Sequence, residues 1–233
     1  MDPIPAADAG PPANVLLLHD SQVTPTGCGT LCACDERTAE LRVRFADDGD
    51  ETVPDEPAAS KLGLLAVGDV TQAAEAENGP DFSGQVAVDA VPDPTNLGAI
   101  GVSISQFCER WGDDERLVVC FHSLDALFRR AEAKTIFEFT YYLNRRLESV
   151  DALAHFHLDP THHDDAIVAA FVDIFDEVVV DDSSEGTVPE ATDDEVASLL
   201  AALDGWADGP DYPWENGQFS EATDEEIEQS LSG

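Results

Sequence analysis

Short apolar runs alternate with helix-patterned segments along most of this chain, and this alternation limits the folds that it can adopt. The runs at 15–18, 62–67 and 116–121 are each too short for a helix but long enough for a strand. They carry few polar residues, as strands do when both faces of their sheet are covered. We therefore predict an α/β fold with a mostly parallel central sheet and helices on both faces.

Two periodicities predict the remaining elements. Alternating apolar and polar residues indicate half-buried strands, and apolar residues three to four apart indicate helices. Further strands are predicted at 39–45, 85–91, 152–158 and 178–180, and helices at 95–111, 123–131, 135–150 and 162–175. Residues 24–34 are rich in Gly, Pro and Thr, and we expect a loop that leads into a short helix.

The predicted elements divide the chain into three parts. Residues 1–13 are expected to form a flexible arm, residues 14–181 the α/β domain and residues 182–233 an acidic tail. The tail repeats Glu-Ala-Thr-Asp at 190–193 and 221–224, and each Thr is suited to cap a short helix. Between the repeats lie aromatic side chains that we expect either to bind a protein partner or to pack on the chain's own domain: Trp206, Tyr212, Trp214 and Phe219.

Acidic residues far outnumber basic ones, with 49 Asp and Glu, 11 Lys and Arg, and a formal net charge of −38. Such a chain repels nucleic-acid phosphates and anionic lipids, so we expect neither nucleic acid nor a membrane as a partner. Carboxylates bind hydrated cations, and molar salt screens their mutual repulsion over about 3 Å. Residues 1–12 lack the pattern of a signal peptide. We therefore expect a cytoplasmic protein of a halophile.

The segment after the first strand is where a parallel-sheet nucleotide-binding protein places its phosphate loop. Such a loop needs Gly, Lys and a hydroxyl group, with an acid at the end of a nearby strand. Residues 27–30 offer two Gly and one Thr but no Lys, and the strand at 116–121 is followed by His122 rather than an acid. Residues 14–18 and 117–121 should then be neighbouring parallel strands. The sequence predicts a vestigial nucleotide pocket formed by Gly27, Gly29, Thr30, His122 and Ser123.

Four segments together resemble a haloarchaeal family of unknown function: Asn14–Leu18, Leu97–Trp111, Val118–Leu127 and Ala154–Asp165. The similar stretches within them are Ile104-Ser105-Gln106-Phe107, Cys120-Phe121-His122-Ser123-Leu124, and His155-Phe156-His157-Leu158-Asp159-Pro160 with His163-Asp164. The resemblance covers roughly residues 14–181. That family's domain is similar to the RecA/KaiC class of P-loop ATPases with a degenerate nucleotide site. The resemblance therefore implies a three-layer RecA-like fold, a role in regulation or assembly, and no catalytic residue. Self-association would follow by analogy with RecA-like domains that pack side by side.

Three predicted strands end near a His, and one of them carries a regular run of polar side chains. His155, His157 and Asp159 alternate along this strand, so their side chains share one face of the sheet. Imidazole and carboxylate groups together bind Zn²⁺ or a similar ion. These three residues are therefore candidate metal ligands, and the other interpretation is that they fill the vestigial nucleotide pocket and hydrogen-bond to its loops.

Three of the five Cys residues, Cys28, Cys32 and Cys34, lie close together in the sequence. Residues four apart share a helix face, so Cys34 would point away from the other two. No second cluster in the sequence completes a tetrahedral set of ligands. We therefore predict that these cysteines are reduced, buried thiols in a packed turn.

Together these features favour a non-catalytic regulatory or scaffold protein without a cofactor, which binds protein partners through its tail. Two alternatives remain open. One is a nucleotide sensor that binds ATP without hydrolysing it. The other is a metal-dependent hydrolase centred on His155, His157 and Asp159.

Overall fold

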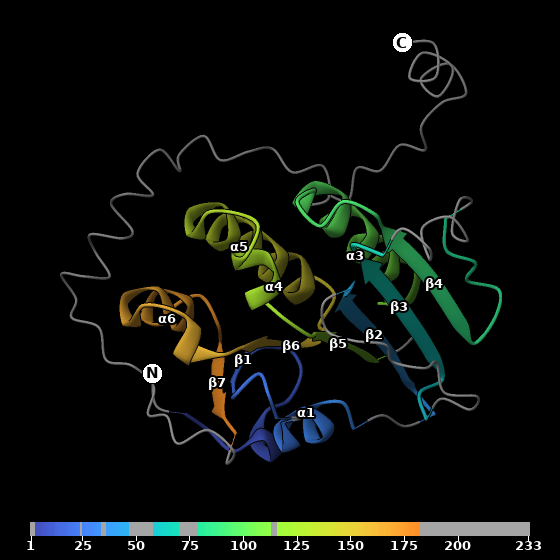
Figure 1. Cartoon of the computed structure of the whole chain (residues 1–233). Coiled ribbons are helices and arrows are strands. Elements are labelled where there is room, and N and C mark those ends of the chain that lie inside the picture. Colours follow the sequence, from blue (N-terminus) through green and yellow to red (C-terminus); the bar gives the residue numbers. More distant parts are fainter. Residues whose placement is uncertain are drawn as a thin grey trace, which may run out of the picture.

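The structure is a computed structural model that describes residues 3–23, 25–33, 36–46, 58–69, 79–112 and 116–181. Within these residues, seven strands form one sheet in the order β4-β3-β2-β5-β6-β1-β7 (Figure 1). All of its pairings are parallel, which confirms the predicted α/β class. The tail predictions lie outside the described residues, namely the two repeats and Trp206, Tyr212, Trp214 and Phe219.

Each predicted strand overlaps an observed one. The strands are β1 (Ala13–Leu18), β2 (Thr38–Phe45), β3 (Lys61–Val67), β4 (Val86–Val91), β5 (Arg116–Phe121), β6 (Leu153–Leu158) and β7 (Glu177–Val180). The helices are α1 (Thr26–Leu31), α3 (Leu97–Trp111), α4 (Asp125–Phe128), α5 (Ala133–Glu148) and α6 (Asp165–Val172), with 3₁₀ turns η1 (Ala6–Asp8) and η3 (Pro160–His162). The helix predicted at 162–175 starts later than expected because His163 is extended, with φ −131° and ψ 156°.

Helices cover both faces of the sheet, as predicted. In Figure 1, α3, α4, α5 and α6 lie on one face, and α1 lies on the other with η1. The first face holds the larger core, where Phe107 of α3, Phe139 of α5 and Phe171 of α6 belong to one buried cluster with Phe121 and Phe156 of the sheet. Burying an aromatic ring of this size contributes about 2–3 kcal/mol.

The smaller core lies between α1 and the sheet. Leu31 of α1 clusters with Val15, Leu17 and Val118, which come from β1 and β5. This apolar cluster covers only part of the α1 face, so the same face has room for polar side chains next to it.

The strand register brings those polar side chains together. Cys120 of β5 lies between Arg42 of β2 and His155 of β6, as partners in parallel ladders. Because side chains alternate along a strand, the α1 face also receives the residues two positions further on. Towards the carboxyl ends of the strands, this face therefore carries Arg44, Cys120, His122, His155 and His157.

One prediction about the strand order was wrong. Residues 14–18 and 117–121 lie in parallel strands of the same sheet, but β6 separates them and pairs with both. The chain leaves β1 towards α1 on one face and leaves β6 towards α6 on the other (Figure 1). Where connections of neighbouring strands leave towards opposite faces, a crevice opens at the carboxyl ends of an open α/β sheet.

Among the residues that the structure describes, no helix is both long and apolar enough to cross a membrane.

Candidate functional site

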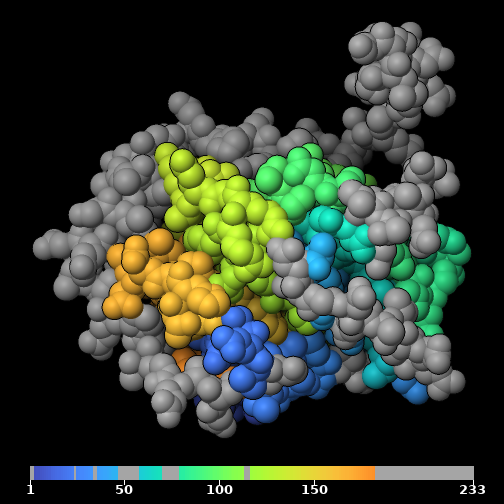
Figure 2. Space-filling view, in the orientation of Figure 1, coloured from blue at the N-terminus to red at the C-terminus, as the bar shows by residue number. Residues whose placement is uncertain are grey.

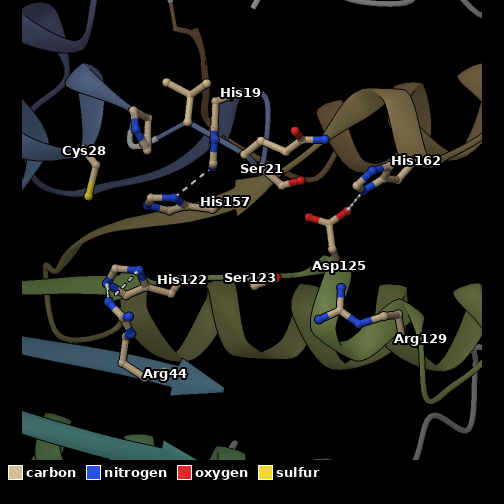
Figure 3. A pocket seen from close by; sticks show the side chains of 13 residues that line it. His19, Ser21, Cys28, Arg44, His122, Ser123, Asp125, Arg129, His157 and His162 are labelled. Atoms are coloured by element: carbon tan, nitrogen blue, oxygen red, sulfur yellow. Dashed lines mark hydrogen bonds and ion pairs between the residues drawn. The ribbon is translucent and has the colours of Figure 1, made fainter. Parts of the chain in front are cut away.

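A cavity of about 440 Å³ opens at the carboxyl ends of β1, β2, β5 and β6 (Figure 3). Its lining comes from segments distant in the sequence, namely residues 19–28, Arg44, residues 122–129, His157 and His162. Figure 2 shows the blue N-terminal segment beside yellow-green and orange segments from later in the chain. Its charged and imidazole lining consists of His19, Arg44, His122, Asp125, Arg129, His157 and His162. This is the edge at which open parallel sheets bind their ligands.

A chain of hydrogen bonds fixes the orientation of two imidazoles at the cavity floor. His19 Nδ1 lies 2.8 Å from the Asp20 carbonyl oxygen, and because a carbonyl only accepts, Nδ1 is the donor. In neutral His19, Nε2 therefore accepts from His157 Nδ1 over 3.0 Å. Burial lowers the pKa of His157 to about 4, so its ring is neutral. The lone pair of His157 Nε2 then points away from His19, towards Cys120 Sγ at 3.6 Å.

His122 lies on the other side of His157. Their rings stack with centroids 5.3 Å apart, and Arg44 Nη1 lies 3.3 Å from each ring nitrogen of His122. Burial, together with the positive charges that His157 and Arg44 can carry, lowers the pKa of His122 to about 2. His122 is therefore neutral, and Arg44 supplies the positive charge on this wall of the cavity.

Asp125 on the opposite wall is already engaged. Its carboxylate accepts from His163 Nε2 at 2.7 Å and from the Asp159 amide at 3.1 Å, and His162 Nδ1 lies 3.7 Å away (Figure 3). These contacts tie α4 to the segment that follows β6. Arg129 ends α4, where its amide donates to the Asp125 carbonyl.

The predicted metal set of His155, His157 and Asp159 is only partly assembled. Asp159 accepts from the Ser21 amide at 2.8 Å and from the amide and hydroxyl of Thr161 at 3.0 and 2.6 Å. Burial raises the pKa of Asp159, but these hydrogen bonds outweigh it and lower the pKa to about 2. The carboxylate is thus ionised and joins two loops, while the donors near His155 and His157 are thiols.

The structure does not assemble the predicted nucleotide pocket. His122 and Ser123 line the cavity, but Gly27, Gly29 and Thr30 do not. At the start of α1, Asp181 Oδ1 accepts from the Gly27 amide at 2.8 Å and from Thr26 Oγ1 at 2.9 Å. This carboxylate occupies the helix end where a phosphate loop would hold a phosphate. The Ser123 hydroxyl instead accepts from the Ala126 amide and caps α4.

Cys120 lies beside the other cysteines, a contact that was not predicted from the sequence. Cys28 Sγ lies 3.9 Å from Cys120 Sγ and 3.5 Å from His155 Nε2, and Cys32 Sγ also lies 3.5 Å from His155 Nε2. The residues that lie beside Cys28 come from β5 and β6, and the spacing of the cysteines in the sequence did not indicate this. Cys34 lies outside the described residues.

Arg44 was missed as well. Arg44 lies on the polar face of a predicted strand, near its carboxyl end. This position could have indicated a site residue, because ligands bind at that edge of a parallel sheet.

The comparisons with known proteins add one relationship. A family model described as a family of unknown function, DUF7504, matches residues 12–180. No curated protein and no solved structure matches the chain. The matched span runs from the start of the sheet to β7 and includes every residue that lines the cavity. The chain therefore belongs to DUF7504, a family of unknown function.

Proposed function

We propose that this chain is a non-catalytic regulatory protein that binds a small anionic ligand in the cavity at the carboxyl edge of its sheet. One observation carries the proposal, namely the charge of that cavity. In a chain of 49 acidic and 11 basic residues, the described lining of this one cavity holds two Arg and a single carboxylate, Asp125, while His122 and His157 there are neutral. That carboxylate already accepts two hydrogen bonds. An anion is the ligand that this balance of charge favours.

The residues at this edge support binding without turnover. Phosphoryl transfer needs a Lys in the phosphate loop and an acid that holds the metal. Residues 24–34 contain no Lys, and β5 is followed by His122. Asp159, the acid after β6, is held by Ser21 and Thr161.

A nucleotide is one anion that this cavity could bind, and the protein would then be a nucleotide sensor that does not hydrolyse its ligand. Because Asp181 fills the start of α1, its phosphates would have to bind at Arg44 and His122 rather than at a phosphate loop. The RecA-like ancestry implied by the sequence resemblance belongs to this proposal, and an all-parallel sheet is compatible with it.

The proposal also includes the part of the chain that binds partner proteins. We expect residues 182–233 to carry the contacts with partner proteins in a cell with molar salt, and self-association of the domain remains compatible with this role. Affinity capture with the whole chain and with residues 1–181 tests the tail. Recovery of the same partners by both baits would contradict its role.

A ligand titration tests the binding step. Thermal unfolding in molar KCl is followed with inorganic phosphate, pyrophosphate, ATP and GTP, for the wild type, Arg44→Gln and the matched control Arg110→Gln on the exposed end of α3. A ligand at 100 times its Kd should stabilise the wild type and the control by about 2.7 kcal/mol, and Arg44→Gln by much less. No stabilisation of the wild type by any of the four anions, or equal stabilisation of Arg44→Gln, would contradict the proposal.

A further inference from the structure

We infer that a transition-metal ion, Zn²⁺ by its ligand chemistry, joins α1 to the sheet through Cys28, Cys120, His155 and His157. This site is separate from the anion site proposed above, although the two share His157 and Cys28 at the cavity floor. Thiolate and imidazole donors together select Zn²⁺ over the hard cations Mg²⁺ and Ca²⁺.

The fold brings the four donors together from three elements. Cys120 and His155 are register partners on β5 and β6, and His157 follows on the same face of β6. Cys28 reaches this face from α1, which packs against it through Leu31. One ligand atom from each residue lies within 4.8 Å of all the others.

Three of the six distances between these atoms match the edges of a tetrahedral zinc site. With Zn–S near 2.3 Å and Zn–N near 2.0 Å, a regular tetrahedron has S–S edges of about 3.8 Å and S–N edges of about 3.5 Å. The Sγ atoms of Cys28 and Cys120 are 3.9 Å apart. Cys28 Sγ lies 3.5 Å from His155 Nε2, and Cys120 Sγ lies 3.6 Å from His157 Nε2. These three edges accommodate the ion with shifts of only about 0.1 Å.

His155 gives independent support, because its surroundings leave it poorly satisfied without an ion. Its side chain is fully buried, and its Nε2 atom faces two sulfur atoms, Cys28 Sγ and Cys32 Sγ, both at 3.5 Å. Thiols are weak hydrogen-bonding groups, so Nε2 is buried at a cost that a metal bond would offset.

His157 is held as a metal ligand is usually held. A ligating imidazole typically donates its other N–H to a neighbouring group, which fixes the ring. His157 Nδ1 donates to His19 Nε2, and Nε2 is left with a lone pair facing Cys120. His19 is therefore a positioning residue for the site.

A bound Zn²⁺ would supply the charge that keeps coordinating thiols deprotonated, so Cys28 and Cys120 can both serve as thiolate ligands.

Four protein donors fill the usual coordination of zinc, as in structural sites. This favours an ion that stabilises the packing of α1 over one that activates water, and so argues against the metal-dependent hydrolase. Cys32 lies 4.0 Å from Cys28 Sγ but is not one of the four donors, so it serves as a matched control.

The test measures metal bound to the full chain, purified in molar KCl without chelators. Elemental analysis should find about one zinc per chain. Added Co²⁺ should give the intense visible bands of a tetrahedral site and a thiolate charge-transfer band. Cys120→Ser should lose the bound zinc and the cobalt bands, whereas Cys32→Ser and the distant Cys108→Ser should keep them. His19→Ala should bind Co²⁺ about 10–100-fold more weakly with the same spectrum.

The Tm of the wild-type protein provides a second readout, which is needed if Cys120→Ser does not fold. A strong chelator should lower the Tm of the wild-type protein, and added Zn²⁺ should restore it. A folded wild type that binds neither metal, a Tm insensitive to chelator, or a Cys32→Ser variant without metal would overturn the inference. Anion binding is measured separately, so either proposal can fail alone.

Discussion

Asp181 shows how a single carboxylate sets the end of a helix. Buried at the end of β7, it accepts from Thr26 Oγ1 and from the Gly27 amide, and so orients α1. The local sequence around residue 27 gave no indication of this partner because it comes from 154 positions further along the chain. Single side chains could thus be assigned to a sheet face from the sequence, but their partners could not.

We predict that Asp181→Ala destabilises the protein by about 1–3 kcal/mol, because it leaves a buried amide and a hydroxyl without this acceptor. Asp181→Asn keeps an acceptor oxygen and should lose less than half as much. Denaturant unfolding in molar KCl measures both values. An Asp181→Ala variant as stable as the wild type would contradict the stabilising role of Asp181 at the start of α1.

Glu177 on β7 gives a prediction for pH. Burial, with the nearby charges of Asp176 and Asp8, raises its pKa in the folded state. The folded protein therefore binds this proton more tightly than the unfolded chain, and stability falls as the pH rises from the ordinary carboxyl pKa through the raised one. Glu177→Gln should be more stable than the wild type at neutral pH, by less than about 1 kcal/mol, since the group is partly exposed.

Below the ordinary pKa of a carboxyl group, the advantage of Glu177→Gln should vanish because both states of the wild type are then protonated. Unfolding curves over this pH range provide the check, with Asp151→Asn in the turn before β6 as a control. An advantage of constant size at every pH would contradict the assignment.

The helices and strands were predictable because their signals are local. Apolar runs and alternation locate all seven strands, and alternation alone places His155 and His157 on one face. The order of the strands depends on contacts between distant segments, which periodicity does not encode. For this reason the insertion of β6 between β1 and β5 was missed, and with it the meeting of Cys28, Cys120 and His155.

The packing of α3 on β3 depends on a glycine. A Cβ atom on Gly63 would lie 2.8 Å from the Phe107 ring and 2.9 Å from Leu41 Cδ1, closer than real contacts allow. Gly63→Ala should therefore cost about 1–3 kcal/mol through displaced core side chains. In α1, a Cβ on Gly29 meets nothing within 4 Å, so Gly29→Ala should be neutral or stabilising by up to about 1 kcal/mol. Equal effects in thermal unfolding would contradict this difference between the two helix–sheet contacts.

Charge acts on the molecule as a whole. With a formal net charge of −38 on 233 residues, the folded state repels itself in dilute buffer, and salt screens that repulsion. We predict that the free energy of unfolding rises steeply from dilute buffer to molar KCl. Unfolding measured at constant pH across this range checks the prediction, and a stability that is flat or falls with salt would contradict it.

At the scale of the whole molecule, the proposed anion cavity and the proposed ion site lie together on the α1 face of the sheet, at its carboxyl edge. The fold class and several site residues, among them His122 and His157, were accessible from the sequence. The complete set was not, since its members come from α1, β2, β5 and β6. His157 belongs to both sites, since the ion would bind its Nε2 atom and its side chain lines the cavity.

The most direct measurement is a crystal structure of protein purified in molar KCl without chelators, with anomalous data collected above and below the zinc absorption edge. The account predicts one anomalous peak at bonding distance from Cys28 Sγ, Cys120 Sγ, His155 Nε2 and His157 Nε2. Density without such a peak, with the four side chains bonded only to one another or to water, would contradict it.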